Sequence, residues 1–278
     1  MSEYFSHTSS HTVQYLKQVQ ALLDQLDPKA APQAVLVPGS PVPRGGIIVF
    51  PGSFNPPTKA HLALLEQAQQ FASHHGLMHV YAAISKHTTD KEKVERLLLL
   101  DRIILLQTLM RDHLPGTGIV LFNRGLYVEQ AEAIRTAFPA VTRLLFLVGF
   151  DKIVQIFDPH YYDNRDAALS ELFALAELLV APRGKAGEEE LAELLGKPEN
   201  QQFARYVHAL PFDKAYRDIS SSEVRQNPEA HRDVIPPEVQ RFIEETHAYE
   251  PPVRQADGSV IDYYGEHIKK LEALLKGS

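Results

Sequence analysis

The sequence contains no cysteine and no tryptophan. Without thiols the chain cannot form a disulfide framework, a cysteine-ligated zinc site, an iron–sulfur cluster or a thiol nucleophile. It also lacks the basic excess that is typical of proteins that bind nucleic-acid phosphates. Its 28 Lys and Arg residues are outnumbered by 35 Asp and Glu residues, which gives a net charge of −7. These absences argue against thiol chemistry and against a nucleic-acid partner.

Long uninterrupted hydrophobic runs are missing as well. The most apolar stretch, Leu97 to Met110, is broken by Asp101, Arg102 and Gln107 and is too short to span a bilayer. The first residues show no basic segment followed by an apolar one, so no secretory signal is visible. We therefore expect a soluble protein with no membrane partner, located in the cytoplasm or, in a eukaryotic cell, also in the nucleus.

What the sequence does contain is a regular alternation of strand and helix patterns. The chain has 278 residues, 44% of them hydrophobic and 23% charged, which is ordinary globular usage. Short apolar runs alternate with helical patterns, and this order predicts an α/β fold with a Rossmann-like, doubly wound parallel sheet. The predicted strands are GGIIVF (45–50), HVYAAI (79–84), GIVLF (118–122), RLLFLVG (143–149), LLVA (178–181) and YVHAL (206–210).

Proline clusters divide the chain into three predicted segments. Residues 1–44 form a helix over 12–26 followed by a proline-rich extended connector, and residues 45–249 form the main domain. Residues 250–278 form a helical tail, which docks on that domain or on a second subunit; the sequence leaves homo-oligomerisation open. The other helical patterns cover 62–71, 94–110, 128–138, 187–195 and 238–249.

The first chemical motif lies between the first strand and the first long helix of the main domain. It reads Pro-Gly-Ser-Phe-Asn-Pro-Pro-Thr-Lys-Ala-His over residues 51–61. This is the carboxyl end of a parallel strand, where open α/β sheets bind ligands. Gly52 allows a close approach to a phosphate, Thr58 is a candidate N-cap, and the helix N-terminus favours an anion. We expect His61, three residues after Thr58, to replace a self-contained cap with a donor that points at the anion.

The second motif, Asp-Ile-Ser-Ser-Ser-Glu-Val-Arg over residues 218–225, follows the last predicted strand. Ser220 and Glu223 have the spacing of a capping box, which would mark a helix start and nothing more. Ser222 and Arg225 are three residues apart and share one face of that helix. Hydroxyls, a helix N-terminus and a guanidinium that face one point suit a polyphosphate.

The two motifs together resemble the signatures of the nicotinamide/nicotinate mononucleotide adenylyltransferases, a family of the nucleotidyltransferase superfamily. The first is similar to its Gly-Ser-Phe-Asn-Pro and Thr/His-x-x-His pattern, and the second to its Ile-Ser-Ser-Thr-x-x-Arg pattern. Gly149-Phe150-Asp151 is similar to the family's Gly-x-Asp. Lys91 and Lys93, ahead of Arg102, are similar to its lysine-bearing loop and helix arginine. The resemblance covers about residues 46–249.

The resemblance implies transfer of AMP from ATP to nicotinamide or nicotinate mononucleotide, which gives NAD or its deamido form and pyrophosphate. Mg²⁺ is then held mainly by the ATP phosphates and needs few protein ligands. The choice between amide and acid acceptor stays open. Family members commonly stack the pyridine ring on a tryptophan, and in this chain Tyr162 could stack instead.

The same resemblance assigns roles to individual residues. The catalytic residues would be His61, Thr58 and Arg225. The residues that contact ATP and its phosphates would be Gly52, Ser53, Phe54, Lys91, Lys93, Gly149, Ser220, Ser221 and Ser222. The residues that contact the acceptor would be Asn55, Arg102, Asp151 and Tyr162.

Two other readings compete with this one. A related nucleotidyltransferase would use another phosphorylated acceptor or CTP, but such relatives usually carry Gly-Thr-Phe-Asp in the first motif. A non-catalytic nucleotide-binding relative would have no need for both His61 and Arg225.

A further segment, residues 123–125 after the third strand, could touch the acceptor, although a plain turn is the simpler interpretation.

Overall fold

The fold is built around a seven-stranded sheet with the strand order β1-β4-β3-β2-β5-β6-β7. The computed structural model describes residues 10–76, 79–86 and 97–277. Every neighbouring pair in this sheet is parallel except β1 and β4, which are antiparallel. The predicted α/β, doubly wound fold is therefore confirmed. The strands are β1 (Ala34–Leu36), β2 (Gly45–Pro51), β3 (His79–Ser85), β4 (Gly118–Phe122), β5 (Val141–Gly149), β6 (Glu177–Ala181) and β7 (Val207–Ala209).

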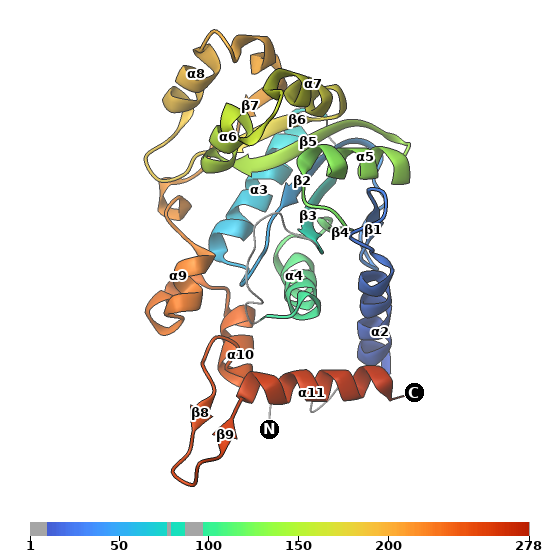
Figure 1. Cartoon of the computed structure of the whole chain (residues 1–278), viewed down its shortest axis with the longest axis vertical. Helices are drawn as coiled ribbons and strands as arrows, with labels where there is room; N and C mark the ends of the chain where they lie inside the picture. Colours follow the sequence, from blue (N-terminus) through green and yellow to red (C-terminus); the bar gives the residue numbers. More distant parts are fainter. Residues whose placement is uncertain (1–9, 77–78, 87–96, 278) are drawn as a thin grey trace.

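Helices cover both faces of the sheet, so its central strands are apolar on both sides (Figure 1). In β2, Ile48 and Phe50 belong to one core, and Ile47 and Val49 belong to the other. This alternation follows from the two-residue period of a strand. The first core is formed with α2 (Ser10–Gln25), α3 (Lys59–His74), α4 (Leu99–His113), α9 (Ser221–Gln226), α10 (Pro237–Thr246) and α11 (Tyr263–Lys276), and the second with α5 (Tyr127–Ala137), α6 (Phe150–Phe157), α7 (Arg165–Leu175) and α8 (Glu188–Gly196).

The strand order places a topological switch point between β2 and β5. From β2 the chain proceeds to β3 and β4 on one side, and it then returns to β5, β6 and β7 on the other. In open α/β sheets the crevice outside the carboxyl ends at such a point binds ligands. The 51–61 motif leaves the carboxyl end of β2, and residues 149–151 leave that of β5.

The predicted extended connector contributes a strand to the sheet, which the sequence pattern did not reveal. Residues 34–36 form β1, paired with β4. The buried amide of Asn123 donates to the carbonyls of Asp27 (2.8 Å) and Ala31 (2.9 Å), and its oxygen accepts from the Gln33 N–H. Asn123 thus anchors the connector.

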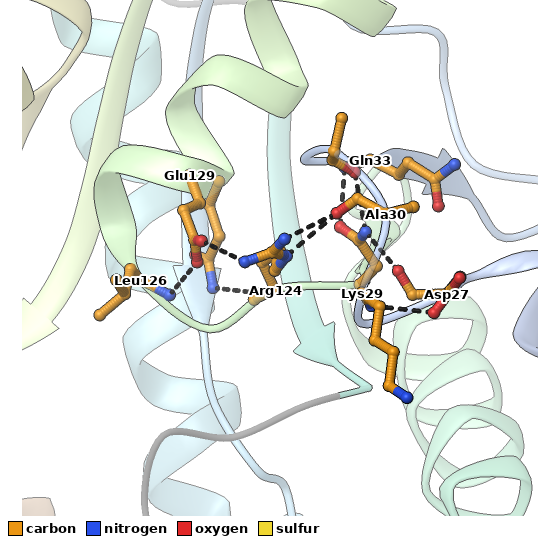
Figure 2. Close-up of polar contacts among 10 residues, drawn as sticks. Asp27, Lys29, Ala30, Gln33, Arg124, Leu126 and Glu129 are labelled. Atoms are coloured by element: carbon orange, nitrogen blue, oxygen red, sulfur yellow. Dashed lines mark hydrogen bonds and ion pairs between the residues drawn. The ribbon is translucent and has the colours of Figure 1, made fainter.

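Arg124, the neighbour of Asn123, ties the same connector to the start of α5. Figure 2 shows its guanidinium between the two segments. It donates to the Ala30 carbonyl at 2.8 Å and pairs with the Glu129 carboxylate at 2.9 Å. With both ends of its guanidinium held in this way, Arg124 serves to fasten the N-terminal segment.

The C-terminal segment docks on the main domain through α11. The Tyr264 hydroxyl donates to Asp101 of α4 at 2.7 Å, and His267 lies 3.1 Å from the other oxygen of that carboxylate. Lys17 of α2 donates to the Gly277 carbonyl, so the N- and C-terminal segments also touch each other. Figure 1 shows α2 meeting α11 at one end of the molecule. The division of the chain into three segments stays a prediction.

The described residues hold several short elements beyond the predicted ones. Helices α6 and α7 lie in a region with no predicted element, and the predicted helix over 94–110 begins at Leu99 in the described part of the chain. Among the described residues no helix is long and apolar enough to cross a membrane. The remaining elements are η1 (Pro159–Tyr161), η2 (Gln201–Tyr206), η3 (Lys214–Tyr216), η4 (Glu229–Val234), β8 (Val253–Arg254) and β9 (Val260–Ile261).

Candidate active site

The loop between β2 and α3 is a tight, largely buried turn. Phe54 has a φ of 46°, in the left-handed region that a side chain with a Cβ rarely adopts. Its ring is fully buried and packs edge to face on Phe50 at 5.5 Å. A Cβ on Gly52 would lie 3.0 Å from the Phe54 ring, so only glycine fits here without displacement. Strained backbone held by packing is typical of functional loops.

His61 caps the helix that follows this loop. Its Nδ1 accepts from the Thr58 N–H at 3.0 Å and lies 2.9 Å from the Thr58 hydroxyl. The expectation that His61 replaces a self-contained cap is therefore wrong in part, because the histidine is the reciprocal partner in one. Since a backbone N–H donates to Nδ1, that atom carries the lone pair and the proton sits on Nε2. The imidazole thus fills two roles, with Nδ1 on the helix and Nε2–H left as a donor.

The surroundings of His61 keep it neutral. Its ring lies against Phe54 at 4.9 Å and Phe50 at 6.0 Å. Burial, followed by repulsion from the Arg183 guanidinium, lowers the pKa of His61 to about 4. At pH 7 the side chain therefore offers a hydrogen bond without carrying a charge.

The second motif meets the first, as its predicted role requires. The Ser221 hydroxyl donates to the Pro56 carbonyl at 2.9 Å, and Arg225 Nη1 donates to the Asn55 carbonyl at 2.8 Å. Arg225 Nη2 also donates to the Ser222 hydroxyl at 3.1 Å. These contacts fix the start of α9 beside the loop, although the two motifs lie more than 150 residues apart in the sequence.

Ser220 occupies the N-cap position of α9, but its side chain makes no capping hydrogen bond. The predicted capping box with Glu223 is therefore wrong. The Ser221 hydroxyl instead donates to the Pro56 carbonyl outside the helix, and the Ser222 hydroxyl accepts from Arg225 within it.

Asn55 has an unsatisfied buried amide. Its side chain is fully buried, and its oxygen accepts from the Tyr249 hydroxyl at 2.8 Å. Its amide nitrogen has no hydrogen-bond partner among the described residues. A buried donor without a partner is costly, and it suits a site that a bound acceptor completes. The role of Tyr249 as the group that orients this amide was not predicted from the sequence.

At the end of β5, Asp151 is paired with a residue that the motif comparison missed. The Arg183 guanidinium lies 3.0 Å from the Asp151 carboxylate, and the two side chains are 49% and 67% exposed. Arg183 follows β6 at the same edge of the sheet. The signal available in the sequence was its position two residues after the predicted strand 178–181.

The other predicted residues are spread around this centre. Arg102 of α4 lies beside the loop, with Nη1 3.5 Å from the Ser53 carbonyl. Gly149 is the N-cap residue of α6, where a Cβ would meet nothing within 4 Å. The Tyr162 hydroxyl donates to the Ile156 carbonyl at 2.8 Å, which holds its ring against α6. Lys91 and Lys93 lie outside the described residues.

No metal cage is visible in the part of the chain that the structure describes, since no group of three or more His, Asp or Glu side chains there is placed to hold an ion. The polar groups beside the loop include three donors, the His61 imidazole, the Arg225 guanidinium and the Asn55 amide. Such a set binds oxyanions, and phosphates above all.

Comparison with known proteins agrees with this geometry. Residues 49–227 match the family model described as cytidylyltransferase-like, which covers more than half of the chain. The protein therefore belongs to the cytidylyltransferase-like family of nucleotidyltransferases. The match spans both motifs and the β5 and β6 ends between them.

This chain is similar to one curated protein and to one solved structure. A protein of Trichlorobacter lovleyi, described as "Probable nicotinate-nucleotide adenylyltransferase", is 26% identical over 216 residues, which covers 72% of this chain and 97% of that protein. A solved structure from Vibrio parahaemolyticus, under the same activity name, is 15% identical, with a TM-score of 0.42, and covers 74% of this chain and 96% of that one.

Proposed function

We propose that the protein transfers AMP from ATP to a pyridine mononucleotide, with nicotinate mononucleotide as the first acceptor to test. The observation that carries this proposal is the contact between the two motifs at the switch point of the sheet. His61 Nε2–H and the Arg225 guanidinium come from segments far apart in sequence, and they converge on one loop. The family match and the named relative support the same reaction class.

In the proposed reaction, a phosphate oxygen of the acceptor attacks the α-phosphorus of ATP. A new P–O bond forms, and the bond between the α-phosphorus and the oxygen that bridges to the β-phosphate breaks. The electron pair leaves on pyrophosphate, so no covalent enzyme intermediate and no proton transfer to the protein are needed. Catalysis then depends on positioning and on stabilising charge.

Each residue of the centre has a defined part in this step. Neutral His61 donates through Nε2 to the α-phosphate as negative charge builds, with Thr58 holding its ring. Arg225 binds the leaving pyrophosphate, with Lys91 and Lys93 as further candidates, and Ser220, Ser221 and Ser222 line the phosphate side. Mg²⁺ would be held mainly by the ATP phosphates and would offset part of their negative charge.

On the acceptor side, the unsatisfied Asn55 amide donates to the incoming nucleotide, and Asp151 accepts from a ribose hydroxyl or a ring amide. Arg102 lies next to the loop that both substrates would touch. Tyr162, whose hydroxyl is already bonded to the backbone, is the aromatic surface proposed for the pyridine.

The decisive experiment measures pyrophosphate release by the purified protein with ATP and Mg²⁺. Nicotinate and nicotinamide mononucleotide are supplied in parallel wells, and CTP replaces ATP in a third set. We expect release that depends on one pyridine nucleotide, and its identity settles acid against amide. In His61→Ala we expect turnover to fall by roughly 10²-fold or more, since a charge-stabilising donor is lost.

The matched control is His74→Ala, which removes the same side chain from the last turn of the same helix. His74 bonds only to the Gln70 carbonyl among the described residues, and this variant should turn over normally. If the wild-type protein binds ATP but releases no pyrophosphate with either acceptor, the proposal is wrong and another acceptor is favoured.

A further inference from the structure

Arg183 forms an ion pair with Asp151, a predicted site residue, but it has no role in the reaction proposed above. It follows β6 (Glu177–Ala181), at the carboxyl edge of the sheet. The short turn after it is closed by two backbone bonds between Arg183 and Ala186, at 3.1 and 3.0 Å. The backbone under this side chain is therefore fixed, while the guanidinium itself is half exposed.

The Arg183–Asp151 ion pair is easily given up. The Arg183 side chain is half exposed and the Asp151 side chain is largely exposed, and exposed ion pairs add little to stability. Asp151 also lies in the first turn of α6 (Phe150–Phe157), where the helix dipole stabilises a carboxylate without any partner. A phosphate competes well for the guanidinium, because Arg binds it through two parallel hydrogen bonds.

Arg183 also acts on the centre of the candidate site. Its positive charge is the second cause, after burial, of the lowered pKa of His61. The neighbouring parallel strands β2, β5 and β6 end on the same side of the sheet, and they lead to the loop before His61, to Asp151 and to Arg183, respectively. This is the region in which the acceptor phosphate would meet the α-phosphate.

We propose that Arg183 exchanges Asp151 for the transferred phosphate when a nucleotide binds, and that it is a further catalytic residue of the reaction. Without a nucleotide, the ion pair with Asp151 keeps the Arg183 guanidinium at the site. With a nucleotide bound, the guanidinium stabilises the negative charge that builds on the α-phosphate. The Asp151 carboxylate is then free to accept a hydrogen bond from the nucleotide. This inference rests on the proposed adenylyl transfer.

The test compares Arg183→Gln and Arg183→Lys with the matched control Arg205→Gln. Arg205 precedes β7 and therefore lies at the amino-terminal ends of the strands, away from the candidate site. Its removal changes the net charge by the same amount. We expect kcat of Arg183→Gln to fall by about 10²- to 10³-fold, with a smaller change in KM for ATP. Arg183→Lys should have a kcat between those of Arg183→Gln and the wild type, because lysine restores the charge but not the bidentate hydrogen bonding. Arg205→Gln should match the wild type.

A second readout does not depend on turnover. Addition of α,β-methylene ATP to the wild-type protein should shift the NMR resonance of the Arg183 Nε–H, and Arg183→Gln should raise the pKa of His61. An unmoved resonance together with normal kcat in Arg183→Gln would overturn the proposal. If the wild type releases pyrophosphate and Arg183→Gln equals Arg205→Gln, the role of Arg183 fails while the proposed function stands. If the wild type is silent, the proposed function fails and the resonance alone decides whether Arg183 meets a nucleotide phosphate.

Discussion

His61 illustrates how one side chain serves both the fold and the candidate site. Its Nδ1 completes the cap of α3, and this bond fixes the tautomer that leaves a proton on Nε2. The lowered pKa then keeps the ring neutral, so that the cap survives at pH 7. A protonated ring would lose the acceptor on Nδ1 and with it the bond to the Thr58 N–H.

This arrangement predicts a pH dependence of stability. The pKa of His61 is about 4 in the folded protein and 6.5 in the unfolded chain, so between these values the unfolded chain binds more protons. The stabilisation is complete above pH 6.5 and is lost as the pH falls toward 4, by about 3 kcal/mol at most. Urea unfolding of the wild type and of His61→Ala, measured from pH 7.5 to 4, checks this.

The two proteins should differ in slope, with the wild type losing more free energy of unfolding over that range. Parallel curves would show that His61 is not buried as described. At pH 7 the variant should be less stable by about 1 kcal/mol, the usual cost of a lost helix cap.

At the scale of elements, α11 (Tyr263–Lys276) supports α4 (Leu99–His113) and through it the site. The Tyr264 hydroxyl accepts from the N–H of Leu98, the residue that caps α4, and donates to Asp101. Burial, together with the Asp101 carboxylate, raises the pKa of Tyr264, so the hydroxyl keeps its proton. Arg102 follows in the same helix turn and reaches the loop at Ser53.

Tyr264→Phe should therefore destabilise the protein by about 2 kcal/mol, because Leu98 N–H and Asp101 each lose a buried partner. The neighbouring Tyr263 is 45% exposed, and Tyr263→Phe should change the free energy of unfolding by less than about 0.5 kcal/mol. Urea denaturation of the two variants tests the difference. Equal stabilities would mean that the Tyr264 hydroxyl contributes nothing to stability.

At the scale of the whole molecule, the N-terminal segment is part of the sheet. It supplies β1 at the edge next to β4, and the buried residues Leu16, Val19 and Leu23 of α2 belong to the first core. Removing it would expose the backbone of β4 and the apolar face under α2. Unprotected strand edges of this kind favour aggregation.

A chain that begins at Gly45 should therefore aggregate or melt well below the full-length protein, even though it keeps both motifs. Size-exclusion chromatography and thermal unfolding of the two chains test this. A monomeric short chain with an unchanged Tm would show that residues 1–44 are an independent appendage.

The sequence alone determined the local elements and the chemistry of the two motifs. The parallel strands were predictable because each is a short apolar run between turn residues, and such runs have few other ways to bury their side chains. β1 was not predictable, because its pairing with β4 and the anchoring by Asn123 are contacts between segments far apart in the chain.

Only the tertiary structure decided how these parts act together. It brings Arg225 to Asn55 and Tyr249 to the same residue, it pairs Arg183 with Asp151, and it gives His61 its second role as a cap. Spacing along a chain specifies neighbours within one helix or strand. The order of strands specifies which loops share an edge, and that order is fixed by packing across the entire sheet.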